Sequence, residues 1–268
     1  MDPPSTAAFN MAADEAALLG HAAGKLPPTL RFYAWNPRAV SIGYFQKATA
    51  EIDQAACKIN GIDLIRRLTG GRAVLHDAEV TYSLVVKEEA AYVPSTITGS
   101  YLFFSRGILS GLARLGVEAD IQVPRAAYGQ VKKTGFSAAC FDAPSHYEIT
   151  VSGRKVVGSA QVRKEGVLLQ HGSILLRFQP ELMAAVMRLN TDTERAVMTA
   201  ELARRAVGLS EVAGRQVGFA EVVDAVRLGI AEECGLDLEG GERPPAETAL
   251  LQELAEKKYS SAEWNLRR

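Results

Sequence analysis

The sequence predicts an α+β fold in which a mixed, mostly antiparallel sheet packs against helices. Residues 147–176 contain three apolar segments joined by tight-turn residues, and residues 96–115 repeat apolar side chains at the helical period. After Pro180 the pattern is helical. With 268 residues, of which 47% are hydrophobic and 23% charged, the chain is long enough to bury a large core.

The first third of the chain is predicted to alternate helices with strands. Helices are expected over residues 9–22, with Asn10 as N-cap, and over 51–60, where Ile52 and Ile59 share an apolar face. Strands are expected over residues 30–35, 40–44, 62–67 and 80–87, with Asn36-Pro37 as the turn between the first two.

The middle of the chain is predicted to hold a long helix, a loop and three strands. The helix covers residues 96–115, and residues 124–138 form a long loop of the kind that is usually functional. Strands at 147–151, 155–163 and 167–176 are joined by Ser152-Gly153 and Glu165-Gly166, which suit tight hairpin turns.

The C-terminal part is predicted to be a helical extension. Its clearest helix covers residues 218–234, and residues 239–247 have the Gly and Pro content of a linker before a terminal helix. We expect a catalytic core over residues 1–180 and an extension over 181–268 that packs on the same domain.

Composition excludes several classes of function. A formal net charge of −1 argues against a nucleic-acid partner, and no apolar run is long enough to span a membrane. The first residues lack the pattern of a secretory signal, so we expect a cytoplasmic protein. The three cysteines form no CxxC pair and no histidines have helical zinc spacing, so neither a metal nor another cofactor is expected.

The densest cluster of candidate site residues lies between two predicted strands. Gly70 and Gly71 allow close approach of the backbone to a ligand, and Arg67 and Arg72 add forked donors, which favours a polar or anionic ligand. Thr69 belongs to the same loop, and His76 is expected to orient it. A surface turn with solvated arginines explains the pattern equally well.

A second cluster surrounds a cysteine. Cys140 follows the long loop and precedes the hairpin that carries Lys155, whose ammonium would favour a thiolate nucleophile. His146 is a candidate base. The alternative is that Cys140 is a packing residue, as we expect for Cys57 and Cys234.

Together these motifs resemble the biotin/lipoate protein ligase and lipoyl/octanoyl transferase superfamily. The matching segments are residues 10–16, 31–37, 40–46, 66–77, 155–161 and 264–265, so the resemblance covers nearly the whole chain. It implies the catalytic-domain fold of that superfamily and assigns Gly158, Ser159 and Ala160 to the substrate site together with the glycine loop.

Within the superfamily the chain is most similar to the LipM-type octanoyltransferases. That resemblance implies transfer of an octanoyl group from acyl carrier protein to a lysine of a lipoyl-domain protein, typically the glycine cleavage H protein. It places the acyl-thioester cysteine at Cys140 and the lysine that lowers its pKa at Lys155.

The octanoyl chain requires an apolar slot, for which Tyr33 and Tyr82 are candidate lining residues together with Val74, Leu75 and Val157. Between Ile121 and Gly166 seven basic residues face three acidic ones, which favours docking of an acidic carrier protein.

Two other functions remain open. The first is an ATP-dependent lipoate-protein ligase, although such ligases generally carry a third glycine where this chain has Arg72, a Gly-Asn pair near Glu79-Val80, and a larger accessory domain. The second is an acyl-binding module without catalysis, against which Cys140 argues.

Overall fold

The computed structural model describes residues 1–122 and 148–267. The predicted loop at 124–138, Cys140 and His146 lie outside the described residues.

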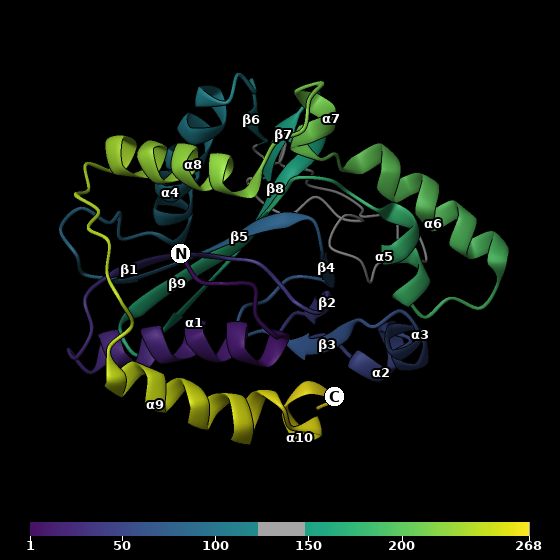
Figure 1. Ribbon diagram of the computed structural model, residues 1–268, viewed down its shortest axis with the longest axis horizontal. Coiled ribbons are helices and arrows are strands. Elements are labelled where there is room, and N and C mark those ends of the chain that lie inside the picture. Colours follow the sequence, from purple (N-terminus) through teal and green to yellow (C-terminus); the bar gives the residue numbers. More distant parts are fainter. Residues whose placement is uncertain (123–147, 268) are drawn as a thin grey trace.

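The fold is organised around a six-stranded antiparallel sheet (Figure 1). Its strands, in spatial order, are β1 (Thr29–Tyr33), β5 (Glu79–Lys87), β9 (Val167–Leu175), β8 (Arg154–Lys164), β7 (Glu148–Val151) and β6 (Asp120–Gln122). The two hairpins of this sheet have the predicted turns: Ser152 (φ 49°) precedes Gly153 (φ 76°), and Glu165 (φ 55°) precedes Gly166 (φ 72°). Two successive positive φ angles match the twist of the paired strands.

A second sheet of three strands stands beside the first. It has the order β3 (Asp63–Arg66), β2 (Ala39–Ile42), β4 (Val74–His76), with β2 parallel to β3 and antiparallel to β4. The predicted mixed, mostly antiparallel sheet with packed helices is therefore confirmed, although it is divided into two sheets.

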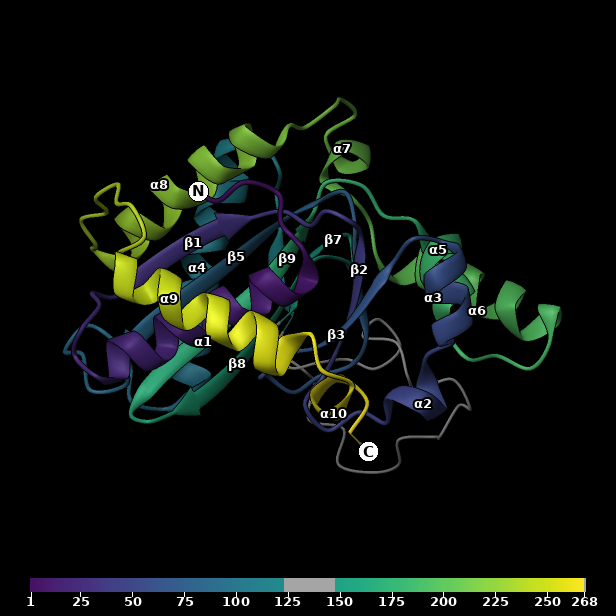
Figure 2. The same ribbon diagram turned by 60° about the horizontal axis from the view of Figure 1, so that its bottom comes forward.

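Helices cover both faces of the large sheet (Figures 1 and 2). The helices α4 (Ile97–Arg114) and α8 (Phe219–Cys234) lie on one face, and α1 (Ala7–Ala22) lies on the other, with α9 (Pro245–Leu254) packed along it. Glycines allow α4 and α8 to touch backbone to backbone, because a Cβ on Gly229 would lie 2.3 Å from the Gly111 nitrogen.

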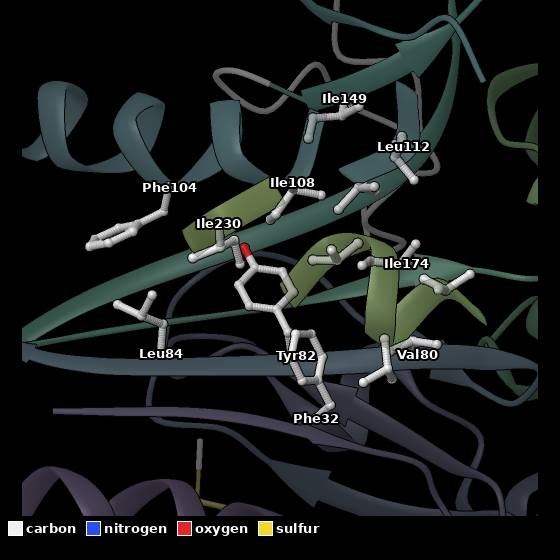
Figure 3. Close-up of a cluster of buried hydrophobic side chains, with 14 of the residues drawn as sticks. Phe32, Val80, Tyr82, Leu84, Phe104, Ile108, Leu112, Ile149, Ile174 and Ile230 are labelled. Carbon is white, nitrogen blue, oxygen red and sulfur yellow. The ribbon is translucent and has the colours of Figure 1, made fainter. Parts of the chain in front are cut away.

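The two faces of the sheet differ in chemistry because side chains alternate along each strand. On the face toward α4 and α8, residues such as Phe32, Val80, Leu84 and Ile174 join the largest hydrophobic cluster, and Tyr82 lies in its middle (Figure 3). The intervening positions of the same strands face α1 and carry mostly polar side chains, namely Arg31, Tyr33, Glu79, Thr81, Ser83, His171 and Ser173.

The remaining helices surround the small sheet and the C-terminus. They are α2 (Ala48–Glu51), α3 (Gln54–Ile59), α5 (Pro180–Val186), α6 (Asp192–Arg205), α7 (Leu209–Val212), the π-helical turn η1 (Ala255–Tyr259) and α10 (Ala262–Asn265). Ile52, Cys57, Met183 and Met187 form part of a second hydrophobic cluster here. In the described part of the chain, no helix combines the length and hydropathy that crossing a lipid bilayer requires.

Several predictions about the N-terminal third were wrong. Thr6, not Asn10, caps α1, because its hydroxyl accepts the Phe9 N–H, whereas Asn10 is fully buried and bonds to the Ser5 and Ala34 carbonyls. The single helix expected over 51–60 is two short helices, and Ile59 is 84% exposed.

Candidate functional site

A cavity lies between the α1-facing side of the large sheet and the small sheet. Of the residues that the structure describes, the following line it: Met11, Tyr33, Trp35, Ser41, Arg67, Gly71, Val74, His76, Thr81, Lys155, Gly158, Ser159, Ala160, His171, Gly172, Ser173 and Leu175. The structure thus brings together Lys155, the 158–160 segment and three of the six candidates around the glycine loop, namely Arg67, Gly71 and His76, which the sequence places far apart. Thr69, Gly70, Arg72 and Tyr82 are not among the lining residues.

Lys155 lies at the start of β8 with its side chain 4% exposed. Its ammonium donates to Glu148 Oε1 on the neighbouring strand β7 at 2.6 Å. The lysine stem folds over Gly158, where a Cβ would lie 2.6 Å from Lys155 Cε and 2.9 Å from Nζ. Gly158 therefore provides the space in which the ammonium sits.

The glycine loop is wrapped around Arg67, which is buried. Its Nε donates to Thr69 Oγ1, Nη1 donates to the carbonyl and hydroxyl oxygens of Ser41, and Nη2 donates to the carbonyls of Gly70 and Arg72. Because these five acceptors match its five N–H groups, Arg67 shapes the loop. The sequence predicted that Arg67 would offer forked donors to a polar or anionic ligand, and the structure gives those donors to the protein itself.

Two parallel chains of hydrogen bonds lead from Arg67 to buried carboxylates. In the first, Thr69 Oγ1 lies 2.7 Å from His171 Nε2, and His171 Nδ1 lies 3.0 Å from Asp14 Oδ2. The Thr69 hydroxyl accepts a hydrogen bond from Arg67, so we assign its own proton to a hydrogen bond donated to His171 Nε2. His171 then carries its proton on Nδ1 and donates it to the Asp14 carboxylate.

The second chain repeats this arrangement. Ser41 Oγ lies 2.7 Å from His76 Nε2, and His76 Nδ1 lies 2.7 Å from Glu79 Oε1. The Trp35 ring stacks on His76 with 4.0 Å between centroids. His76 is thus linked to the glycine loop through Ser41 and Arg67, in agreement with the predicted orienting role.

Asp14 is ionised in this buried setting. Burial opposes the charge, but the hydrogen bond from His171 and the charge of Arg31 hold the pKa of Asp14 below its ordinary value. Burial, reinforced by Asp14, raises the pKa of Tyr33 well above its usual range, so Tyr33 stays neutral and donates to Asp14 at 3.1 Å.

Tyr82, Leu75 and Val157 are core residues and do not line the cavity, in contrast to Tyr33 and Val74. Tyr82 reaches the cavity wall only indirectly, because its hydroxyl donates to Ser159 Oγ at 2.6 Å. This hydrogen bond joins β5 to β8, two strands whose proximity was not predicted from the sequence.

The cavity can therefore hold an apolar group beside a buried ammonium. Its polar wall residues, such as Ser41, Arg67, Thr81 and His171, are hydrogen-bonded within the protein, so an occupant need not satisfy them. Met11, Trp35, Val74 and Leu175 supply apolar wall. No cluster of His, Cys, Asp or Glu among residues 1–122 and 148–267 is arranged to hold a metal ion.

Sequence reasoning missed Asp14, Ser41, Glu79 and His171 as parts of the site. His171 lines the cavity, and its Nδ1 is hydrogen-bonded to Asp14. Nothing local signals this role, because its partner Asp14 is 157 residues away along the chain.

Comparison with known proteins adds independent findings. The family model of the lipoyl protein ligase A/B catalytic domain matches residues 6–231. The chain is 46% identical to "Octanoyltransferase LipM" of Kyrpidia tusciae, covering 98% of this chain and 96% of the relative. It is 42% identical to "Octanoyltransferase LipM" of Bacillus subtilis, covering 97% and 94%.

Solved structures of lipoate protein ligases share the fold of this chain. The bipartite lipoate protein ligase of Thermoplasma acidophilum is similar with a TM-score of 0.81 and 26% identity, covering 100% of this chain and 96% of that one. A lipoate-protein ligase A bound with ATP has a TM-score of 0.77 and 28% identity, covering 99% of both chains.

Proposed function

The chain belongs to the lipoyl protein ligase A/B catalytic-domain family and, within it, to the LipM octanoyltransferases; on this premise we propose that it transfers octanoyl groups through a cysteine thioester. The donor is octanoyl acyl carrier protein, the nucleophile is Cys140, and the acceptor is a lysine of a lipoyl-domain protein, with the glycine cleavage H protein as the expected acceptor.

The reaction has two acyl-transfer steps. The Cys140 thiolate attacks the octanoyl thioester, a carbon–sulfur bond forms to Cys140, and the carrier thiolate leaves and takes up a proton. The neutral amine of the acceptor lysine then attacks the Cys140 thioester, forms the amide and releases the thiolate. No ATP is consumed, because the acyl group arrives already activated.

Lys155 is proposed to favour the Cys140 thiolate as an ammonium, to give its proton to the departing carrier thiolate, and then, as a neutral amine, to take up the proton that the attacking lysine loses. Its support is its place in the cavity wall and its short contact with the Glu148 carboxylate. An ammonium at 4% exposure acts in a medium of low dielectric, so its effect on a nearby thiol is strong.

The cavity is proposed to hold the octanoyl chain. Burying seven hydrocarbon groups at about 0.8 kcal/mol each would contribute roughly 5 kcal/mol before ordering costs. The internally satisfied polar walls support this use, since an apolar chain leaves no partner unpaired.

Carrier docking is proposed to rely on charge. Seven basic residues against three acidic ones between Ile121 and Gly166 suit an acidic carrier, and association should weaken as salt increases.

The observation that carries the proposal is the combination of 46% identity to a LipM octanoyltransferase with a cavity that contains a buried ammonium. The test is incubation with octanoyl carrier protein followed by intact-mass and peptide analysis. We expect one hydroxylamine-labile octanoyl group on Cys140 and none in Cys140→Ala. If Cys140 stays unmodified while the chain still transfers octanoyl groups to the acceptor, the proposed thioester intermediate is refuted.

A lipoate-protein ligase is the second candidate, because solved ligases share the fold at TM-scores of 0.81 and 0.77. The two functions differ in the substrate that they activate. If ATP with free octanoate or lipoate modifies the acceptor as fast as the octanoyl carrier does, the ligase interpretation replaces the transferase.

A further inference from the structure

Arg66, the neighbour of Arg67, is a fully buried arginine whose partners come from two distant segments. Its guanidinium donates to the carbonyls of Gly43, Tyr44 and Gln46 at 2.8–3.0 Å. It also donates to the carbonyls of Trp264, Asn265 and Arg267 at 2.7–3.2 Å. Arg66 thereby connects the C-terminal residues to the loop after β2.

The C-terminal residues also occupy the outer edge of β3. The Asn265 side chain accepts the backbone N–H of Arg66 at 3.0 Å, and the Trp264 indole donates to the Arg66 carbonyl at 2.9 Å. Two side chains therefore satisfy the backbone groups that a further strand would otherwise pair. We call Lys258, Tyr259, Trp264, Asn265 and Arg267 the C-terminal clasp.

The clasp is anchored at its other end to α1. The Glu15 carboxylate, 3% exposed, accepts the Lys258 ammonium at 2.6 and 2.8 Å and the Tyr259 hydroxyl at 2.9 Å. The Asn265 amide donates to the Tyr259 carbonyl at 2.7 Å, which joins the two ends of the clasp. The turn that carries Lys258 and Tyr259 is π-helical, a geometry frequent at functional sites.

The loop held by Arg66 is in direct contact with the glycine loop. The Tyr44 N–H donates to the Thr69 carbonyl at 2.8 Å. Gly43 approaches Gly71 so closely that a Cβ on Gly43 would lie 2.0 Å from the Gly71 oxygen. Gly71 lines the cavity, so a displacement of residues 43–46 moves the cavity wall.

We propose that the C-terminal clasp is a positioning element of the acyl site: through Arg66 it holds residues 43–46, and these residues hold the glycine loop against the cavity. Trp264 and Asn265 are positioning residues for acyl binding although neither lines the cavity. This proposal rests on the proposed function for its ligand, an eight-carbon acyl chain.

The test compares Asn265→Ala and Trp264→Phe with Lys257→Ala, all in the full-length chain. Lys257 is an exposed residue of η1 that pairs only with Glu253 in the contacts described, so it serves as the matched control. Trp264→Phe keeps an aromatic ring but removes the indole donor. Octanoate binding is measured by calorimetry, octanoyl transfer by steady-state kinetics, and amide hydrogen exchange by peptide mass spectrometry.

We expect Asn265→Ala to weaken octanoate binding about tenfold and Trp264→Phe about threefold, as loss of buried hydrogen bonds predicts. Hydrogen exchange should accelerate in peptides covering residues 43–47 and 67–73, and stay unchanged in β9 and α4. The KM for octanoyl carrier protein should rise more than kcat falls. Lys257→Ala should change none of these values.

The proposal is overturned if the clasp variants lower the melting temperature but leave octanoate affinity and the exchange of residues 43–47 and 67–73 unchanged. Equal acceleration of exchange in every peptide would assign the clasp to global stability alone and would overturn it as well. If the unaltered chain neither binds octanoate nor transfers octanoyl groups, the proposed function fails, and the exchange pattern alone then decides the clasp.

Discussion

The face of the six-stranded sheet that meets α4 and α8 is packed with hydrocarbon, whereas the opposite face is hydrophobic at one end, where Val85, Val167 and Leu169 pack on α1, and carries charged and hydroxyl-bearing side chains toward the cavity. Tyr82 and Ile174 belong to the first face; His171 belongs to the second, where it is hydrogen-bonded to Asp14 of α1. The apolar face is held by hydrocarbon contacts, whereas the polar face holds its hydroxyls, imidazoles and carboxylates in one hydrogen-bonding pattern. One face of the sheet thus contributes hydrophobic stability, and the other face positions the residues of the site.

The largest expected effect comes from the polar side. Lys155→Ala should lower the rate of Cys140 acylation by roughly 10³-fold, about 4 kcal/mol, because it removes the group that we propose stabilises the thiolate and relays the proton. The free energy of unfolding of the Lys155→Ala variant should change by far less than these 4 kcal/mol. The measurement is single-turnover acylation by octanoyl carrier protein beside urea unfolding; equal rates for the variant and the unaltered chain would remove Lys155 from the mechanism.

The matching change on the apolar side is Ile108→Ala in α4. Ile108 is fully buried between the sheet and α8, so the cavity left behind should cost about 3 kcal/mol of unfolding free energy. Transfer kinetics at 20 °C should stay within about twofold, a difference below 0.5 kcal/mol. A loss of activity comparable to that of Lys155→Ala would show that the two faces are not separable.

Asp14→Asn tests the polar face by pH. The pKa of Asp14 is lower in the folded chain than its ordinary value of 3.8, so the unfolded chain binds more protons in that range and stability rises with pH. The contribution is complete above the unfolded pKa and disappears as pH falls through the folded one.

We expect Asp14→Asn to cost about 2 kcal/mol at pH 7, and the difference between the two chains to shrink as the pH falls below 4. Urea unfolding at pH 3 to 7 measures this difference. A difference that stays constant over this range would mean that folding does not lower the pKa of Asp14.

Gly158→Ala is the smallest and most specific change. A methyl group would lie within 3 Å of Lys155 Cε and Nζ, so the ammonium must move while the strand is retained. The acylation rate should fall about tenfold, or 1.4 kcal/mol, with unfolding affected by less than about 1 kcal/mol. Gly166→Ala, in a hairpin turn away from the cavity, is the control for a glycine whose loss affects stability alone.

The apolar face was the predictable half of the fold. The helices α4 and α8 and the β7–β8–β9 hairpins were predicted because periodicity and turn residues are local signals. The strands β4 and β6 were missed because three residues are too few to show alternation. Local periodicity can also mislead: Ile59 fits an apolar stripe, but it is exposed because α3 ends at this residue.

The polar face was predictable only in part. The glycine loop and Lys155 stand out in the sequence, and both border the cavity. The links from His171 to Asp14 and from Arg66 to Asn265 join residues 157 and 199 positions apart, and no spacing rule connects residues so distant. Arg67 was expected to donate to a ligand because the sequence reveals that its side chain carries donors. The sequence does not reveal the protein oxygens that accept from it.

The close contact of α4 with α8 also bears on how the chain is made. Gly107, Gly111 and Gly229 leave no side chain between the two backbones, and a methyl on Gly111 would meet the Val226 Cα at 2.5 Å. During synthesis from the N-terminus, every strand of the large sheet leaves the ribosome before α8 exists. A nascent chain that ends before residue 219 therefore contains all six strands and α4, but the hydrophobic face of the sheet still lacks the cover of α8.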